Sequence, residues 1–176
     1  MQYQNIIFAG PVGAGKTTAI CAVSEIEPLL TDALATDETR DRKEKTTVAM
    51  DYGRITRGDG ERVHLYGTPG QDRFDFMWEI LLKGGTGLIL LIDNARPDPL
   101  GDVRTYAEAF AGIIREQRLV FGITRTDLKT SPKIDDYREF LDMFSLRVPV
   151  LAIDARKACD VRNLIETLLS LQKSSA

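Results

Sequence analysis

Residues 10–17 read Gly10-Pro11-Val12-Gly13-Ala14-Gly15-Lys16-Thr17. One glycine, four further residues and then Gly-Lys-Thr form the pattern of the phosphate-binding loop known as the P-loop. Glycine lets the backbone curl until successive amide N–H groups face an anion, and the N-terminus of the next helix adds its positive dipole. Lys16 supplies charge to the outer phosphates, and the Thr17 hydroxyl suits magnesium. The alternative is a glycine-rich turn capped by threonine, but the apolar run before the motif favours the P-loop.

Short apolar runs alternate with longer amphipathic stretches on both sides of this loop. Strands are predicted at residues 5–9, 48–56, 62–66, 87–92, 119–123 and 148–153, with a hairpin turn at 57–60. Helices are predicted at residues 16–26, 74–83, 101–116, 135–144 and 160–171. This alternation predicts an α/β fold of three layers, with a six-stranded, mostly parallel sheet, one antiparallel edge strand and helices on both faces.

The composition is that of an ordinary globular protein. The 176 residues are predicted to form a single domain, 1–176, and 43% of them are hydrophobic and 28% charged. A net charge of −3 argues against binding to nucleic acid. Cys21 and Cys159 have no metal-ligand spacing and are predicted to be reduced thiols. Because we find no membrane-spanning run, signal peptide or prenylation cysteine, we expect a cytoplasmic protein with no direct membrane anchor.

Three further motifs resemble those of the small Ras-like GTPases, in the order that this family requires. Thr68-Pro69-Gly70-Gln71 resembles the second switch, Asp-x-x-Gly-Gln, Thr124-Arg125-Thr126-Asp127 resembles the guanine-reading motif, and Asp154-Ala155-Arg156 resembles Ser-Ala-Lys. Residues 47–53 and 65–74, with Trp78, are similar to bacterial GTPases of the MglA and conservon type. The resemblance implies a Ras-like P-loop GTPase fold, bound GTP or GDP with Mg²⁺, a cytoplasmic switch and a roadblock-domain partner.

The chemistry of the predicted guanine site can be argued from its residues. A carboxylate at Asp127 accepts hydrogen bonds from the N1–H and N2–H₂ donors of guanine, a pair that adenine lacks. The stem of Arg125 can lie along the base, and the amide of Ala155 can donate to the guanine O6. The predicted guanine-binding residues are Thr124, Arg125, Asp127, Asp154, Ala155 and Arg156. The alternative for Asp127 is an ordinary loop residue.

The resemblance also implies how hydrolysis is catalysed. Gln71 orients the attacking water, and Lys16 and Thr47 complete the catalytic set, with Thr46 as the fallback for Thr47. The predicted phosphate-binding residues are Gly10, Val12, Gly13, Ala14, Gly15, Lys16, Thr17, Thr18 and Gly70. Val12 adds bulk where an arginine from a partner approaches, and Arg40, Arg42 and Arg73 are candidates for an arginine within the chain. Hydrolysis is therefore expected to be slow without a partner.

Two segments are predicted to sense the nucleotide. The polar stretch 28–46 is either a solvated loop or a functional one, and its position between the phosphate site and the next strand favours function. A nucleotide-sensitive partner surface is predicted on this loop and on the helix 74–83, where Phe76 and Ile80 form either an exposed patch or a second buried face.

Magnesium binding departs from the family pattern, because Gly67 stands where the second switch begins with aspartate. The hairpin is predicted to set Asp51 opposite Tyr66, beside Gly67. The predicted metal ligands are therefore Thr17, Thr47 and, through water, Asp51. Asp51 is otherwise an edge-strand residue or an ion-pair partner of Arg54. His64, the only histidine, is predicted to pack or hydrogen-bond rather than to catalyse.

Two other functions remain open from the sequence. A GTP-binding interaction protein with negligible hydrolysis is favoured by Val12 and Gly67, whereas Gln71 favours a GTPase. A P-loop kinase or ATPase requires an acceptor site or lid, and we find neither motif in the sequence.

Overall fold

The computed structural model describes residues 4–30, 50–69, 87–114 and 118–171. The strands are β1 (Gln4–Ala9), β2 (Asp51–Thr56), β3 (Arg62–Gly67), β4 (Gly87–Asp93), β5 (Leu119–Thr124) and β6 (Val150–Ala152). They form one six-stranded sheet in the order β2-β3-β1-β4-β5-β6, in which β2 runs antiparallel to β3 and every other neighbouring pair is parallel. The predicted fold class is confirmed.

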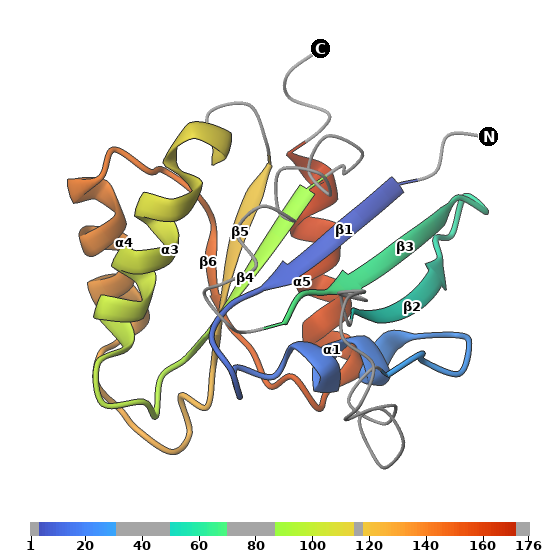
Figure 1. Cartoon of the computed structure of the whole chain (residues 1–176), viewed down its shortest axis with the longest axis horizontal. Helices are drawn as coiled ribbons and strands as arrows, with labels where there is room; N and C mark the ends of the chain where they lie inside the picture. Colours follow the sequence, from blue (N-terminus) through green and yellow to red (C-terminus); the bar gives the residue numbers. More distant parts are fainter. Residues whose placement is uncertain (1–3, 31–49, 70–86, 115–117, 172–176) are drawn as a thin grey trace, which may run out of the picture.

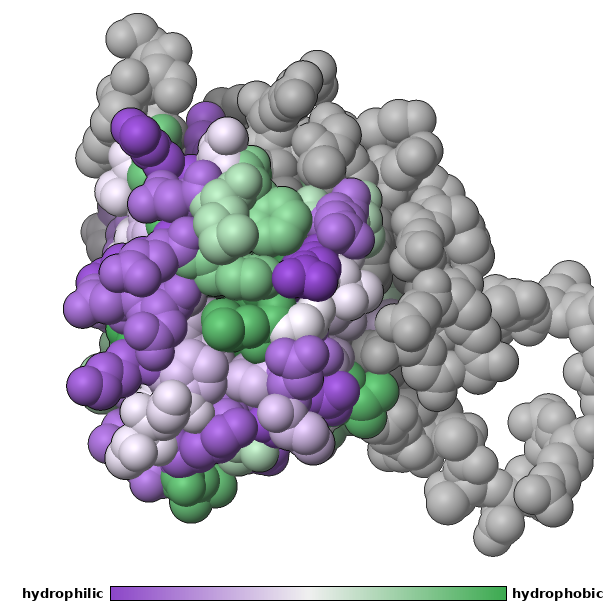
Figure 2. Space-filling model, turned by 90° about the vertical axis from the view of Figure 1, so that its left-hand side faces the viewer, coloured by the Kyte–Doolittle hydropathy of each residue, from purple (hydrophilic) through white to green (hydrophobic). Residues whose placement is uncertain are grey.

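Helices cover the sheet on both faces (Figure 1). The helices are α1 (Lys16–Val23), α3 (Pro99–Ile114), α4 (Ile134–Met143) and α5 (Ala158–Ser170). One apolar core joins α1 and α5 to the sheet, and a second core joins α3 and α4 to its other face. All residues of β4 are buried, as expected for a central parallel strand between two helical layers. Figure 2 shows the side of α3 and α4, which is mostly hydrophilic and has a hydrophobic area near its centre.

Several predicted boundaries were wrong by a few residues. Helix α1 ends at Val23 rather than 26, because Ser24 turns to an extended conformation. Helix α3 starts at Pro99, before the predicted 101, because proline suits the first helical position and the Asp98 carboxylate accepts the Gly101 amide at 2.9 Å. The predicted helix 74–83 lies outside the described residues. Within the described residues, no helix combines the length and apolarity needed to span a membrane.

The chain after α1 runs along the outer edge of β2. Leu29 exchanges two backbone hydrogen bonds with Tyr52, at 3.0 and 2.9 Å. The Arg54 carbonyl accepts the Glu25 amide at 2.8 Å, and the Arg54 amide donates to the Ser24 hydroxyl at 3.2 Å. Residues 24–29 therefore cover the edge strand.

Candidate functional site

The phosphate loop joins β1 to α1 and has a backbone that glycine permits. Gly10, Gly13 and Gly15 have φ angles of 137, 81 and 100°. A Cβ atom at Gly10 would lie 2.1 Å from the carbonyl oxygen of Leu91, so no side chain fits there. Gly15 caps α1, whose first intrahelical bond runs from Ala19 to the Gly15 carbonyl at 2.8 Å. The backbone amides of residues 16–18 thus have no acceptor within the helix, so they can donate hydrogen bonds to a bound anion.

The Lys16 side chain is hydrogen-bonded to the backbone of the phosphate loop. Its ammonium donates to the carbonyls of Gly10 and Pro11 at 2.7 and 2.8 Å. Burial lowers the pKa of Lys16 to about 8, and the charge of Asp51 partly offsets this effect. A phosphate arriving at the loop would favour the charged form of the amine, so ligand binding and protonation are coupled.

Thr17 and Asp51 meet beside Gly67. The hairpin pairs Asp51 with Gly67, one residue beyond the predicted Tyr66. The Thr17 hydroxyl donates to Oδ2 of Asp51. A Cβ atom at Gly67 would lie 3.1 Å from the Asp51 Cβ, so the two positions share one small space. A carboxylate therefore lies next to the Thr17 hydroxyl although β3 ends in glycine.

A pocket of about 260 Å³ opens next to the phosphate loop. Its lining comes from three loops, namely Ala14, Gly15 and Thr18 of the phosphate loop, Thr124, Arg125, Asp127 and Leu128 after β5, and Asp154, Ala155 and Arg156 after β6. Every predicted guanine-binding residue lies in this lining. The carboxyl ends of β1, β5 and β6 thus bring together motifs that are far apart in the sequence.

Two groups in this pocket are free to meet a ligand. Asp127 is exposed, and no hydrogen bond occupies its carboxylate among the described residues. The amide of Asp154 already donates to the Asp160 carboxylate in α5 at 2.9 Å, and the amides of Arg156 and Lys157 donate to acceptors on Asp154 at 3.0 and 2.9 Å. The structure gives no such acceptor to the amide of Ala155 within the described residues. A carboxylate and an amide donor therefore face the same pocket.

Other polar side chains of the pocket lining hold the loops in place. The buried Thr124 hydroxyl lies 3.1 Å from the Ala14 carbonyl and 3.2 Å from the Ile92 carbonyl, which ties β5 to the phosphate loop and to β4. Arg125 has a φ of 55° and forms an ion pair with the Asp93 carboxylate.

Asp154 and Arg156 form a two-bonded ion pair, at 2.9 Å for both contacts. These bonds lower the pKa of Asp154 to about 2. Asp154 therefore remains a carboxylate throughout the neutral range, and Arg156 neutralises its charge at the rim of the pocket.

In a comparison with known protein families, residues 26–173 match the family described as conserved hypothetical ATP binding protein. This region covers most of the chain. The chain belongs to this ATP binding protein family. The matched region starts after the phosphate loop, so the P-loop pattern of residues 10–17 lies outside the family match.

Sequence similarity also relates this member of the ATP binding protein family to other curated proteins, including these two. The uncharacterized protein MJ1339 of Methanocaldococcus jannaschii is 33% identical over 84 residues, 47% of this chain and 51% of that protein. Intraflagellar transport protein 22 of Chlamydomonas reinhardtii is 26% identical over 106 residues, 60% of this chain and 52% of that protein. The chain thus spans about half the length of the curated relatives it matches.

Among solved structures, the Arl6 BBS3 small GTPase from Trypanosoma brucei, with the bound nucleotide analogue GppNp, has a similar fold. The TM-score is 0.73 over 99% of both chains, at 17% sequence identity. This member of the ATP binding protein family therefore has the small Ras-like GTPase fold.

Part of the predicted site lies outside the described residues. Thr46, Thr47, Gly70, Gln71, Arg40, Arg42 and Arg73 all belong to this part, as do Phe76 and Ile80. Val12 is described and is 62% exposed at the phosphate loop. His64 lies outside the phosphate site, and its Nδ1 forms a 2.7 Å hydrogen bond with the Tyr52 hydroxyl. Cys21 and Cys159 are free thiols.

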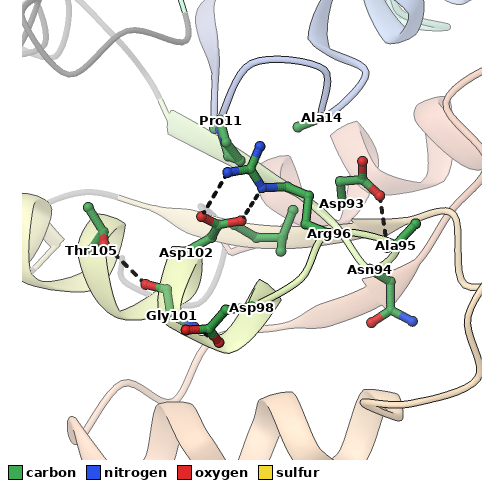
Figure 3. Close-up of polar contacts among 12 residues, drawn as sticks. Pro11, Ala14, Asp93, Asn94, Ala95, Arg96, Asp98, Gly101, Asp102 and Thr105 are labelled. Atoms are coloured by element: carbon green, nitrogen blue, oxygen red, sulfur yellow. Dashed lines mark hydrogen bonds and ion pairs between the residues drawn. The ribbon is translucent and has the colours of Figure 1, made fainter.

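Sequence reasoning missed Asp93 and Asn94 at the end of β4. Asp93 pairs with Arg125, and its Oδ1 accepts the Ala95 amide at 2.9 Å (Figure 3). Asn94 is fully buried. The signal was present, because two polar residues directly after a wholly apolar run mark the carboxyl end of a buried strand, where ligand loops meet.

Proposed function

We propose that this protein binds a guanine nucleotide with magnesium and acts as a Ras-like switch that hydrolyses GTP. The observation that carries the proposal is the pocket in which Asp127 and the amide of Ala155 lie next to the phosphate loop. Guanine offers two N–H donors to a carboxylate and one carbonyl oxygen to an amide. Adenine offers neither the donor pair nor the carbonyl, so this pocket suits guanine although the family is described as ATP binding.

The described residues also fit a magnesium ion. A hydroxyl has one proton and two lone pairs, so Thr17 can donate to Asp51 and still offer oxygen to a metal. Mg²⁺ bound with nucleotide phosphates needs only one or two carboxylates and keeps several waters. Asp51 would act as the acidic partner, through water, with Thr17 and Thr47 as direct ligands. The ion would neutralise charge that develops on the transferring phosphoryl group.

The remaining catalytic roles are proposed from the motifs. Lys16 places an ammonium at the outer phosphates, and its two backbone carbonyl contacts orient it before the ligand arrives. Gln71 would orient the attacking water, and the amide of Gly70 would contact the γ-phosphate. The expected outcome is slow intrinsic hydrolysis.

A competition assay tests the base preference. Displacement of a fluorescent GDP analogue by GDP, ADP and XDP is measured in the presence of Mg²⁺. We expect GDP to compete at a concentration at least about 100-fold lower than ADP, since each hydrogen bond to a charged group is worth about 1.5–3 kcal/mol. Equal competition by ADP would reject the guanine assignment and favour the adenine nucleotide that the family description names.

A second candidate is a GTP-binding interaction protein that hydrolyses almost nothing. The exposure of Val12 at the phosphate loop favours it, because a side chain there obstructs an arginine from a partner. Single-turnover hydrolysis of GTP separates the two candidates. A rate indistinguishable from that of Lys16→Ala, with or without a cell extract, would support the interaction protein.

The narrower proposal is a cytoplasmic bacterial switch of the MglA or conservon type with a roadblock-domain partner. It is supported by the motifs at residues 47–53 and 65–74 alone. Hydrogen exchange of residues 31–49 and 70–86 with GDP and with GppNp tests the switch. Identical exchange in both states would argue against switching. Binding of a purified roadblock-domain protein only in the GppNp state would support that partner.

A further inference from the structure

Asn94 is a buried polar side chain with two different partners. It is 0% exposed and directly follows Asp93, the last residue of β4. Its Nδ2 donates to the Lys129 carbonyl at 2.5 Å, and its Oδ1 accepts the Tyr137 hydroxyl at 2.6 Å. The direction of both bonds is fixed, because the Lys129 carbonyl can only accept a hydrogen bond.

These bonds hold the far end of the loop that carries Asp127. Lys129 is anchored twice, since its Nζ also donates to the Arg96 carbonyl at 3.0 Å. The near end is anchored by the ion pair of Arg125 with Asp93 and by the bond from the Asn94 amide to the Thr124 carbonyl, at 3.0 Å. Figure 3 shows the side chains of Asp93 and Asn94 pointing to opposite sides of the chain at the end of β4.

Tyr137 connects this anchor to α4. Its side chain is 0% exposed and packs in the second apolar core. Burial raises the pKa of its hydroxyl far above neutrality, so it remains a donor. A buried side chain of α4 therefore binds Asn94, and Asn94 in turn binds the loop at Lys129.

Asp127 itself is not fixed by any hydrogen bond of its side chain among the described residues. Its position follows from the backbone of the turn in which Leu128 donates to the Arg125 carbonyl at 3.1 Å. A carboxylate accepts two donors from one base only when its plane is aligned with them. The anchors at both ends of residues 125–129 therefore decide whether Asp127 forms one hydrogen bond or two.

We propose that Asn94 and Tyr137 are positioning residues that set the selectivity of the pocket for a base with two adjacent N–H donors. This inference rests on the proposed guanine function. It differs from that proposal because it concerns the alignment of Asp127 and not its identity. Hypoxanthine lacks the 2-amino group of guanine, so the ratio of IDP to GDP dissociation constants reports the second hydrogen bond alone.

The test measures binding of GDP, IDP and ADP to the wild-type chain, Tyr137→Phe and Asn94→Asp. Wild type is expected to prefer GDP to IDP by about 10-fold or more. Tyr137→Phe should reduce this ratio by about threefold or more, because Asn94 loses the donor that orients it. Asn94→Asp should reduce it further, because a carboxylate cannot donate to the Lys129 carbonyl. The control is Leu141→Ala on the same helix, which should lower Tm and leave the ratio unchanged.

The outcomes separate the two proposals. A wild-type chain without preference for GDP over ADP would reject the guanine function before any variant is considered. A wild-type preference that Tyr137→Phe leaves intact, or equal losses of GDP and IDP affinity, would overturn the positioning role alone. If Asn94→Asp does not fold, Tyr137→Phe decides, since it removes one buried hydroxyl and keeps the ring in the core.

Discussion

A side chain at position 67 would occupy the space next to the Asp51 side chain. Moving the carboxylate from β2 to β3, by combining Asp51→Gly with Gly67→Asp, therefore tests the proposed metal site. A Cβ atom at Gly67 would lie 3.0 Å from the Ile20 Cδ1 and 3.3 Å from Asp51 Oδ2. Gly67→Asp therefore adds overpacking of about 1–3 kcal/mol. It also adds repulsion between two carboxylates, about 4 kcal/mol at 4 Å and an effective dielectric constant of 20, which the partial exposure of Asp51 reduces to about 2 kcal/mol.

The expected values follow for each variant. Gly67→Asp alone should lower the free energy of unfolding by about 3–5 kcal/mol. Asp51→Gly alone should lower it by about 2 kcal/mol, through the lost acceptor for Thr17 and a glycine in a strand. The double variant removes the clash and the repulsion, so its loss should be at least about 2 kcal/mol smaller than the sum of the single losses.

The assay is urea unfolding without nucleotide, followed by titration of Mg²⁺ against nucleotide release. Gly67→Ala is the control that adds the methyl group without charge. We expect Asp51→Gly to need about tenfold more Mg²⁺ for nucleotide retention and the double variant to recover part of that loss. Additivity of the two substitutions within about 0.5 kcal/mol, together with an unchanged Mg²⁺ requirement in Asp51→Gly, would refute the shared site.

Three further predictions follow from the geometry. Asp127→Asn should weaken GDP binding about 100-fold and improve XDP binding, because an amide can donate to the extra carbonyl of xanthine; unchanged selectivity in the competition assay would contradict the assignment. Since the folded pKa of Lys16 is about 8, below its ordinary value of 10.5, the free energy of unfolding without nucleotide should rise between those pH values. In the same window GDP affinity should fall by up to about tenfold per pH unit, with proton uptake seen by calorimetry in two buffers; no proton uptake at pH 9 would count against it. Gly10→Ala, whose Cβ would lie 2.1 Å from the Leu91 carbonyl oxygen, should lose about 3 kcal/mol or more of stability in urea unfolding, and a loss under about 1 kcal/mol would be inconsistent with the loop geometry.

Local sequence patterns predicted the fold class, and the errors lie at helix boundaries and in the register of the hairpin. A hairpin turn at residues 57–60 predicts pairing centred between Gly58 and Asp59. In the structure Gly60 has a φ of 83° and the Arg57 amide donates to the Glu61 carbonyl at 2.9 Å, so the turn gains a residue. Each residue of β3 therefore pairs one position further along, which places Asp51 opposite Gly67.

The pocket lining was predictable because each motif follows a buried strand, and parallel strands end at one edge of the sheet. The anchors of those loops were not predictable in the same way. Tyr137 and Asn94 lie 43 residues apart, and their hydrogen bond depends on how α4 packs on its face of the sheet. The same holds for the pairing of Leu29 with Tyr52, since no local pattern around Leu29 predicts a strand.

The covered edge of β2 limits how this chain can associate with other chains. An exposed edge strand offers unpaired backbone groups to any extended segment and invites aggregation. Here the outward amides and carbonyls of Tyr52 and Arg54 are taken by residues 24–29, and hydrogen bonds from Thr56 lower the pKa of the Glu25 carboxylate. A partner protein that binds this hairpin must therefore contact its side chains. A strand of the partner could pair with β2 only after the hydrogen bonds of residues 24–29 to β2 had broken.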